Sequence, residues 1–535
     1  MSSINSIFSD RQTLIEEISE TDAPEWDLII IGGGITGAGV LREAVRCGYR
    51  CLLIEQKDFA WGTSSRSSKM VHGGLRYLVS GDLALTKDSL TERERLLSEV
   101  PGLVDRAGFY FILRKGRFPG RWSMSVVLKI YDYIAGIRDA CYYAKDEIQQ
   151  RLKGIRTQGL KGGWYYTDAR TDDARLVLRL LQEASGHGGK LLNYVKAKNL
   201  IIDNNKVRGV KLENSLNGEV FDLHARVVVN STGVWADKLR NELNDEKRVR
   251  PLRGSHLVIA PERLPITEAV AIFHPIDNRG VFMFPWENTV LVGTTDLDHT
   301  GDLDLEPTIT NPEVDYLLHA VNFEFPDLNL SREDIVSTYA GVRPVIGSDK
   351  SKDPSKERRD HAVWMDNGLV TVSGGKLTTF RTIALDVLKT ASELLGEAKT
   401  KTNNDDRVFA KVSVQAEKLL PEDPQRALRL IGRYGEKVSE LISTAIAEEL
   451  TVIDRTPYCL AECRWALQHE MVCHLDDLLL RRTRLGLLLP NGGELLFDSL
   501  HEMFIKELAW SEEKWLYELQ RYQGVWRSHY SLPCE

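Results

Sequence analysis

The sequence predicts an α/β fold: a Rossmann-like nucleotide-binding domain, a second domain rich in strands, and a helical domain at the C-terminus. Three observations support this prediction. A buried strand, a glycine-rich turn and a helix follow one another over residues 26–47. Short alternating strands occur in residues 250–345, and after about residue 400 apolar residues recur at three- and four-residue spacing, which is typical of helices.

The first motif has the pattern of a dinucleotide-binding turn. Trp26–Ile31 is a continuous apolar strand, and it leads directly into Gly32, Gly34 and Gly37 of a G-x-G-x-x-G sequence. Gly32 permits the tight turn, Gly34 lets the backbone approach a pyrophosphate, and Gly37 lets the next helix pack closely. Glu55 ends the second strand and can accept ribose hydroxyls, which disfavours NADP. This segment alone leaves FAD and NAD open.

The composition excludes several classes of protein. The chain has 535 residues, 42% of them hydrophobic, which is enough for a large core without disulfide or metal staples. The net charge of −8 argues against a protein that coats nucleic acid, so we expect no nucleic-acid partner. No apolar run is long enough to span a bilayer. The scattered cysteines and the acidic N-terminal residues predict a reducing, bacterial-type cytoplasm and no metal site.

A hydroxyl-rich loop, Thr63–Lys69, follows the second strand, and His72–Tyr77 comes directly after it. Hydroxyls, a lysine and paired glycines suit a loop that contacts an anionic cofactor, although solvated loops that cap helices share this composition. Together with Ile31–Gly39, these segments closely resemble the FAD-dependent glycerol-3-phosphate dehydrogenase family, part of the D-amino-acid-oxidase-like flavoproteins. Further matches to that family are Tyr131-Asp132, Asp172–Leu176, Val229–Gly233, Arg253–His256, Gly293–Asp296, Gly341–Pro344, Gly374–Thr379 and Arg481–Arg484.

The resemblance implies a discontinuous domain order. It gives an FAD-binding domain at 25–80, 171–249 and 346–399, a substrate-binding domain with an antiparallel sheet at 81–170 and 250–345, and a C-terminal helical domain at 400–535. Three features depart from the family. Residues 1–24 have no counterpart and are expected to form a variable arm, Arg66 stands where a small residue is expected, and Phe380 stands where tyrosine is common.

The resemblance also implies a reaction. The family oxidises sn-glycerol 3-phosphate to dihydroxyacetone phosphate by hydride transfer from C2 to N5 of FAD, and its usual electron acceptor is a membrane quinone. Two enzymatic alternatives stay open: an oxygen-using glycerol-3-phosphate oxidase, and an amine or amino-acid oxidase of the same superfamily. A flavin-binding scaffold without catalytic activity is a more distant alternative. The sequence leaves the oligomeric state open, with a homodimer as one candidate.

A dianionic substrate requires fixed cations in its site. By their place in the family motifs, the expected substrate-binding residues are Arg76, Tyr77, Arg359 and Lys376. The expected catalytic pair is His256 and Arg343. His256 is the better general base, since a guanidinium hardly ever deprotonates, and Arg343 would stabilise the developing alkoxide. His256 could also be a buried core histidine.

The resemblance assigns a larger set of residues to FAD. These are Gly32, Gly34, Thr36, Gly37, Glu55, Ser64, Ser68, His72, Gly73, Thr232, Gly233, Gly375, Leu377 and Thr378. The helix that follows Gly375 can direct the positive end of its dipole toward the flavin, where reduction leaves negative charge.

One basic and aromatic segment predicts contact with a membrane surface. Residues 109–131 contain five basic residues and no acid, interleaved with Phe109, Phe111, Phe118 and Trp122. Such a segment can lie on anionic lipid with its rings in the headgroup layer, although a solvated helix face with a few core aromatics has the same composition. We therefore expect a peripheral, monotopic protein on the inner face of a bacterial membrane.

Overall fold

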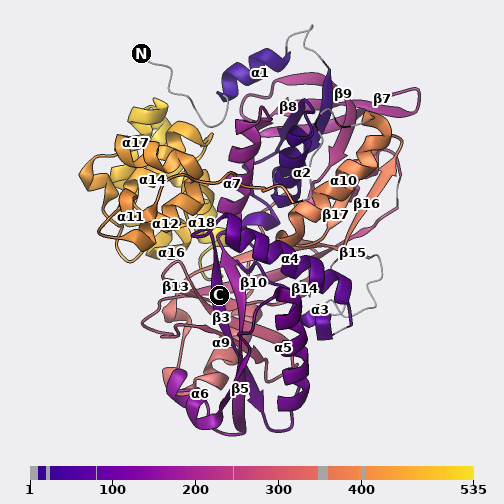
Figure 1. The fold of residues 1–535 in the computed structure, drawn as a ribbon. Helices are drawn as coiled ribbons and strands as arrows, with labels where there is room; N and C mark the ends of the chain where they lie inside the picture. Colours follow the sequence, from indigo (N-terminus) through magenta and orange to yellow (C-terminus); the bar gives the residue numbers. More distant parts are fainter. Residues whose placement is uncertain are drawn as a thin grey trace.

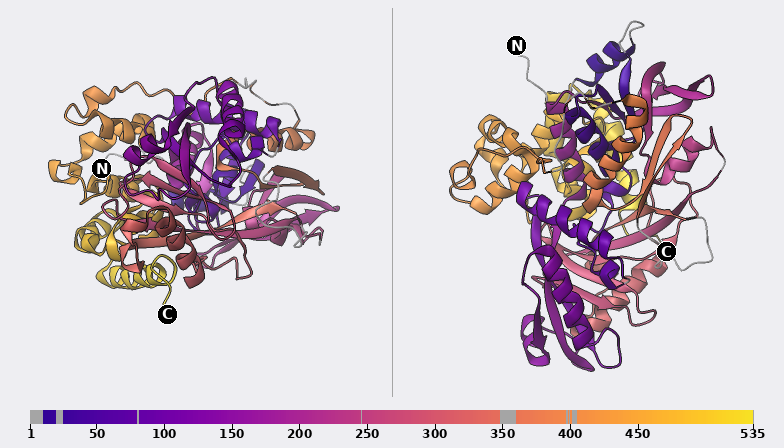
Figure 2. Two further views of the ribbon diagram at one scale, coloured as in Figure 1. Left: turned by 90° about the horizontal axis from the view of Figure 1, so that it is seen from below. Right: turned by 45° about the vertical axis from the view of Figure 1, so that its right-hand side comes forward.

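The computed structural model describes residues 10–19, 25–79, 81–244, 246–347, 360–396, 398, 400 and 405–534. In Figure 1 the nucleotide-binding sheet lies above a second sheet, and the C-terminal helices, orange to yellow, lie beside them, as the left view of Figure 2 also shows. The predicted fold class is confirmed: a Rossmann-like domain is interleaved with an α+β domain, and a helical domain follows.

The predicted opening strand lies in the middle of the first sheet. β1 (Trp26–Ile31) pairs in parallel with β2 (Cys51–Ile54) and with β9 (Val220–Asn230). All of β1 is buried, as expected for a strand covered on both faces. The strand order is β16-β17-β9-β1-β2-β6, with β7 and β8 joined to β9. The bounds of the other strands are β6 Lys190–Leu192, β7 Val195–Asp203, β8 Lys206–Asn214, β16 His361–Asp366 and β17 Leu369–Gly374.

Three helices pack together on this sheet. α2 (Ile35–Arg46) lies between α7 (Asp173–Gly186) and α10 (Phe380–Leu395). Phe380 begins α10 and is buried against α2, where the Cβ of a residue at position 39 would lie 3.0 Å from the Phe380 ring, so glycine allows the close packing. The family motif at Gly374–Thr379 thus returns the chain from β17 to the neighbourhood of the glycine turn.

The second sheet is mainly antiparallel, as the family resemblance implied. Its order is β14-β10-β13-β12-β11-β3-β5-β4, β15 pairs with β10, and β3 and β11 run parallel. The strand bounds are β3 Val104–Arg114, β4 Cys141–Ala144, β5 Leu160–Thr171, β10 Val249–Ile259, β11 Ala269–Phe273, β12 Gly280–Trp286, β13 Thr289–Gly293, β14 Leu297–Asp298 and β15 Ile335–Ile346. The associated helices are α3 Leu75–Val79, α4 Leu83–Glu99, α5 Arg121–Ala135, α6 Lys145–Arg151 and α9 Asn311–Glu324.

The helical domain is more broken than the sequence periodicity predicted. The helix expected over Arg426–Leu450 ends at Tyr434, because Gly435 adopts a φ of +60° and leaves space that the Arg179 guanidinium fills. The helix expected over Leu460–Leu480 is also interrupted. The helices of this domain are α11 Ala416–Leu419, α12 Pro424–Tyr434, α13 Val438–Thr444, α14 Leu460–His469, α15 Leu475–Asp477, α16 Leu485–Leu488, α17 Phe497–Leu508 and α18 Glu512–His529, whereas α8 (Ala236–Arg240) follows β9 of the first sheet.

Part of the expected N-terminal arm is packed on the first domain. α1 (Arg11–Ser19) buries Leu14, Ile15 and Ile18, and the Arg11 guanidinium donates a hydrogen bond to the Asn193 carbonyl at 3.1 Å. Residues 1–9 and 20–24 lie outside the described residues.

The C-terminal domain is joined to the nucleotide-binding domain by buried ion pairs. Arg481 Nε lies 2.5 Å from Asp58 Oδ2, and Arg482 makes two contacts with the same carboxylate at 2.6 and 2.8 Å. All three side chains are at most 1% exposed. Burial alone would raise the pKa of Asp58, but the two guanidinium groups outweigh it and hold this pKa below its ordinary value.

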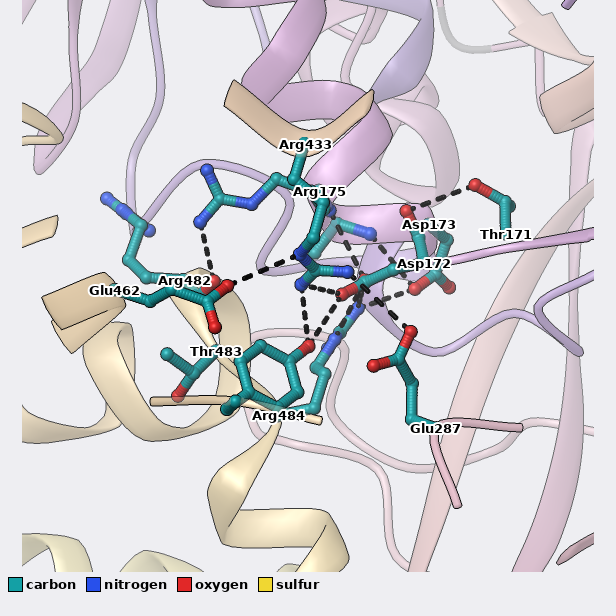
Figure 3. A network of polar contacts seen from close by, with 12 residues as sticks. Thr171, Asp172, Asp173, Arg175, Glu287, Arg433, Glu462, Arg482, Thr483 and Arg484 are labelled. Atoms are coloured by element: carbon teal, nitrogen blue, oxygen red, sulfur yellow. Dashed lines mark hydrogen bonds and ion pairs between the residues drawn. The ribbon is translucent and has the colours of Figure 1, made fainter. Parts of the chain in front are cut away.

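A second group of ion pairs lies at the start of α7 (Figure 3). Arg484 contacts Asp172 at 3.0 Å and Asp173 at 2.5 Å, and Arg433 contacts Asp172 at 2.8 Å. Arg484 and Arg433 come from the helical domain, whereas both acids stand at the N-terminus of α7. A buried ion pair is costly to break from one side, so these contacts fix the relative position of the two domains.

We expect Asp58→Asn to lower the free energy of unfolding by about 3–5 kcal/mol, because it leaves the buried Arg481 and Arg482 short of a negative partner. Urea unfolding followed by circular dichroism measures this change. The matched control is Glu262→Gln, which removes the exposed partner of Arg455 and should cost less than about 1 kcal/mol. A loss below about 1 kcal/mol in Asp58→Asn would contradict the role assigned to the pair.

The same variant has a predicted pH dependence. Because the pKa of Asp58 is depressed in the folded state, its stabilisation is present above the unfolded pKa of about 3.9 and is lost as the pH falls. The stability difference between the wild type and Asp58→Asn should therefore be constant near neutral pH and shrink below about pH 4.

Candidate active site

A cavity of about 1430 Å³ lies where the glycine turn of the first sheet meets the second sheet. Its walls come from the carboxyl end of β1, from the loop after β2, and from β10, β12, β15 and the segment after β17. Ligands of open α/β sheets bind outside the carboxyl ends of the strands. Pockets for one small ligand measure about 300–1,000 Å³, so this cavity has room for a dinucleotide and a small substrate.

The glycine turn has the geometry that the motif predicts. Gly32 has a φ of +111°, which favours glycine, and a Cβ at position 37 would lie 1.9 Å from the Gly32 carbonyl oxygen. The first amide of α2, on Ile35, donates to Ser64 Oγ at 2.9 Å, so the hydroxyl-rich loop covers the start of this helix. The helix N-terminus and this hydroxyl group face the cavity together, as an anion site requires.

Glu55 closes the same end of the cavity. Its two carboxylate oxygens accept hydrogen bonds from the Gly33 amide at 2.7 Å and the Lys57 amide at 2.9 Å. Burial raises the pKa of Glu55, and these amide donors oppose that effect. Each carboxylate oxygen has a further lone pair, so the ribose hydroxyls of a dinucleotide can still be accepted.

Most of the predicted cofactor residues line the cavity. Those that do are Gly32, Gly34, Thr36, Glu55, Ser64, Ser68, His72, Thr232, Gly233, Gly375, Leu377 and Thr378. Gly37 and Gly73 support the walls from behind. A Cβ at position 73 would lie 2.1 Å from the Leu90 side chain, so this glycine lets α4 pack against the His72 turn.

His256 lies on β10 and lines the cavity from the second sheet. Its Nε2 atom is 2.9 Å from Ser68 Oγ, and its ring stacks on Tyr339 at 4.6 Å between centroids. Burial, followed by the positive charges of Lys69 and Arg343, holds the pKa of His256 well below its ordinary value. The imidazole is therefore neutral at neutral pH.

Arg343 lies on the neighbouring strand β15 and lines the same cavity. Its Nη2 atom donates to the Thr295 carbonyl at 3.2 Å and lies 3.6 Å from Asp296 Oδ1. A Cβ at position 254 would lie 2.3 Å from this Nη2 atom, so Gly254 of the Arg-Gly-Ser-His motif provides the space that the guanidinium occupies.

Lys376 and Tyr77 meet at the cavity wall. The Lys376 ammonium lies 3.6 Å above the Tyr77 ring and donates to Ser89 Oγ on α4 at 2.9 Å. Both residues line the cavity. Arg359 lies outside the described residues, and so does the side chain of Arg76, whose backbone belongs to α3.

Asp168 was missed by the sequence analysis. It lies on β5, and its Oδ1 accepts from the Gly73 amide at 2.9 Å and from Arg93 at 3.0 Å, while its Oδ2 accepts from the Tyr131 hydroxyl at 3.1 Å. It thereby holds the His72–Gly73 turn against the cavity. Tyr131 of the family motif was the only signal available, because Asp168 is 95 positions away from Gly73.

The cavity also has an apolar arm. Phe111, Phe273 and Phe282 line it together with Met124 of α5 and Phe118, which precedes α5, and the cavity lining also includes Arg117, Asp277 and Arg279. Phe118 is 76% exposed although it lines the cavity, so this arm opens beside α5.

The predicted membrane segment is only partly exposed. Phe109 and Tyr131 are fully buried core residues, and Arg114 is paired with Glu324 at 2.6 Å, so these parts of the prediction are wrong. The side chains of Phe109 and Tyr131 point inward because of their positions along β3 and α5. The exposed apolar residues that remain, here called the α5 face, are Phe118, Trp122, Val126, Ile130 and Tyr133. Arg121 and Lys129 are exposed on the same helix. No helix within the described ranges combines the length and apolar composition needed to cross a bilayer.

Two family models match the chain. The model described as "FAD dependent oxidoreductase" matches residues 27–381, and "C-terminal domain of alpha-glycerophosphate oxidase" matches residues 390–515. Among curated proteins, the aerobic glycerol-3-phosphate dehydrogenase of Staphylococcus haemolyticus is 35% identical over 512 residues, covering 91% of this chain and 90% of that protein. The chain belongs to the FAD-dependent glycerol-3-phosphate dehydrogenase family.

Other relatives agree with this membership. The aerobic glycerol-3-phosphate dehydrogenase of Staphylococcus aureus is 35% identical, with 86% of each chain covered. The crystal structure of glycerol-3-phosphate dehydrogenase from Bacillus halodurans, complexed with FAD, superimposes with a TM-score of 0.79 at 27% identity and covers 98% of each chain. L-alpha-glycerophosphate oxidase from Mycoplasma pneumoniae shares the fold, with a TM-score of 0.57 over 73% of this chain and 100% of that chain, at 17% identity.

FAD is the cofactor of this family, and the cavity fits it. A Cβ at position 34 would lie 3.1 Å from Ser64 Oγ, so the turn leaves a cradle that only a bare backbone keeps open to a pyrophosphate. Glu55 is placed to accept ribose hydroxyls at the same end.

Proposed function

We propose that this protein oxidises sn-glycerol 3-phosphate to dihydroxyacetone phosphate with FAD and passes the electrons to a membrane quinone. The observation that carries the proposal is that Arg343, Lys376 and His256 line one cavity with the dinucleotide turn. Two cations and a neutral imidazole beside a flavin site suit a phosphorylated alcohol, whereas an amine substrate would be repelled. The names of the curated relatives support the same substrate.

Lys376 and Tyr77 are proposed to bind the substrate phosphate, with Arg76 and Arg359 as further cations. The Lys376 ammonium lies over the Tyr77 ring and is held by Ser89, which fixes its position in the wall. A positioned point charge of this kind compensates part of the dianion, and a guanidinium can hold two phosphate oxygens at once.

His256 and Arg343 are proposed to act on the C2 hydroxyl. FAD, when bound, supplies the acceptor for the hydride from C2. His256 is neutral, which is the form that can accept the hydroxyl proton, and bound phosphate offsets the nearby positive charges that disfavour the imidazolium. Arg343 stabilises negative charge that develops on the substrate oxygen, and Asp296 and the Thr295 carbonyl orient its guanidinium.

The proposed acceptor is a quinone because of the apolar arm of the cavity. The arm is lined by aromatic side chains and opens at Phe118, next to the α5 face. A protein that rests on anionic lipid through this face, with Arg121 and Lys129 near the headgroups, would place the opening where a lipid-soluble quinone can enter. This arrangement corresponds to peripheral attachment to the inner face of a bacterial membrane.

An oxygen-using oxidase is the second candidate. The C-terminal residues 390–515 match a domain that is described by a glycerophosphate oxidase, so the helical domain does not separate the two activities. Quinone reduction and oxygen consumption, measured with sn-glycerol 3-phosphate as the substrate, distinguish the two activities.

We expect His256→Ala to lower kcat by about two to four orders of magnitude, the range for loss of a general base. Arg343→Ala should reduce turnover strongly while the protein keeps its FAD. Steady-state kinetics with sn-glycerol 3-phosphate and a soluble quinone, together with flavin content per chain, measure both effects. His501→Ala, at a partly exposed histidine paired with Glu512 outside the cavity lining, is the control. Normal turnover in His256→Ala would refute its assignment, and loss of FAD from Arg343→Ala would show a structural role.

We expect charge reversal at Arg121 and Lys129 to release the holoenzyme from phosphatidylglycerol vesicles. Each basic residue near such a surface contributes about 1 kcal/mol, so binding should fall roughly fivefold or more per charge. Reduction of quinone in the vesicles should fall in parallel, while reduction of a soluble dye stays normal. The control is the same reversal at Lys206 and Lys211 of β8, at the opposite end of the molecule (Figure 1). Unchanged vesicle binding would remove the α5 face from the proposal.

A further inference from the structure

A short segment between β14 and α9 connects two walls of the cofactor cavity. Asp302–Thr308, here called the latch segment, runs past Trp61 and Trp235. Trp61 lies in the loop after β2, and Trp235 lies in the turn after β9, so the two indoles come from opposite sides of the glycine turn. Both line the cavity. Their rings are 5.9 Å apart, and Gly62 lets Trp235 approach within 3.4 Å of where a Cβ would stand.

Two acidic residues of the latch segment accept hydrogen bonds from the two indoles. Trp61 Nε1 donates to Glu306 Oε1 at 3.0 Å, and Trp235 Nε1 donates to Asp304 Oδ1 at 3.0 Å. Leu305, between the two acids, is 64% exposed. The segment therefore lies outside the two indoles, with its acids turned toward them and its apolar side chain turned to solvent.

Each acid is also paired with a cation. Glu306 lies 3.0 Å from Arg66, with both side chains at most 10% exposed, and Asp304 lies 2.8 Å from Lys238. Burial alone would raise the pKa of Glu306, but the Arg66 guanidinium outweighs it and lowers this pKa, so the carboxylate stays charged. Arg66, which stands where the family resemblance led us to expect a small residue, also contacts the carbonyl of Trp61.

The end of the chain secures the latch segment from the other side. The Tyr530 hydroxyl accepts from Arg66 Nη2 at 3.1 Å, and the Tyr530 carbonyl accepts from the Thr338 amide at 2.7 Å. His529 Nδ1 lies 2.8 Å from the Thr308 hydroxyl. Tyr530 is 4% exposed, so the C-terminal end of α18 is packed between the latch segment and β15.

We propose that the latch segment, secured by Tyr530, retains FAD in this protein, and that Asp304 and Glu306 are positioning residues that hold the two indole walls closed. The cofactor end of the cavity opens only when the indole donors leave their acceptors and the ion pair with Arg66 breaks. Hydrogen bonds to a charged group contribute about 1.5–3 kcal/mol each, which corresponds to roughly ten- to hundredfold in the release rate of FAD.

The test measures release of FAD from the holoenzyme as the rise of free-flavin fluorescence after dilution. Glu306→Gln should release FAD roughly ten- to hundredfold faster. Asp304→Asn should act in the same direction with a smaller effect, because its carboxylate is 39% exposed. The matched control is Asp302→Asn, in the same segment, where the side chain accepts only from the Asp304 amide among the hydrogen bonds described. A wild-type release rate in Glu306→Gln would overturn the proposal.

Tyr530→Phe tests the contribution of the chain end. It keeps the buried ring and removes the hydroxyl acceptor of Arg66, so FAD release should accelerate roughly tenfold, whereas the thermal unfolding of the FAD-free protein, followed by circular dichroism, should change only slightly. Tyr517→Phe, on the exposed face of α18, is its control. Equal release rates in the two variants would show that Tyr530 does not contribute to the retention of FAD. Faster release together with unfolding at a clearly lower temperature would show general destabilisation instead. Neither readout depends on the substrate or the electron acceptor.

Discussion

The structure depends on a set of arginines that are buried between the helical domain and the FAD domain. A guanidinium cannot be deprotonated to escape burial, so each one requires a carboxylate at a fixed place in the core. Asp58, in the loop after β2, pairs with Arg481. At the start of α7, Asp172 pairs with Arg433 and Asp173 pairs with Arg484. The acids stand on the nucleotide-binding domain and the arginines on the helical one. The constraint therefore acts between segments far apart in the chain, although Asp476 and Asp477 of the helical domain also pair with Arg481, at 2.7 and 2.6 Å.

The same contacts reach the candidate active site through one loop. Asp173 accepts from Arg484, from Lys69 and from the hydroxyl of Ser67. Ser68, the next residue, lies against His256. The hydroxyl-rich loop that covers the start of α2 is thus fixed from behind by the helical domain and faces the cavity with its other side. The docking of the helical domain and the geometry of the candidate active site therefore depend on the same contacts.

The spacing of residues along the sequence predicted those structural features that depend on residues close together in the chain. The turn from Trp26 to Gly37 could be predicted because its strand, glycines and helix are encoded within a dozen residues. His256, Arg343 and Lys376 could be brought to one site only through the family resemblance, since they come from separate strands. Contacts between distant residues had no local signal: Arg66 meets Tyr530 across 464 positions, and the break at Gly435 exists because Arg179 of another domain needs the space. Burial of Phe109 and Tyr131 was missed because composition does not give the direction of a side chain.

We propose that this cavity transfers hydride from glycerol 3-phosphate to FAD. Mixing the holoenzyme with sn-glycerol 3-phosphate under anaerobic conditions tests it most directly, with the oxidised-flavin absorbance band as the readout. We expect this band to bleach with the phosphorylated alcohol, and to stay unchanged with glycerol or with an amine. Bleaching by amines alone, or no bleaching by any of the three, would contradict hydride transfer from glycerol 3-phosphate.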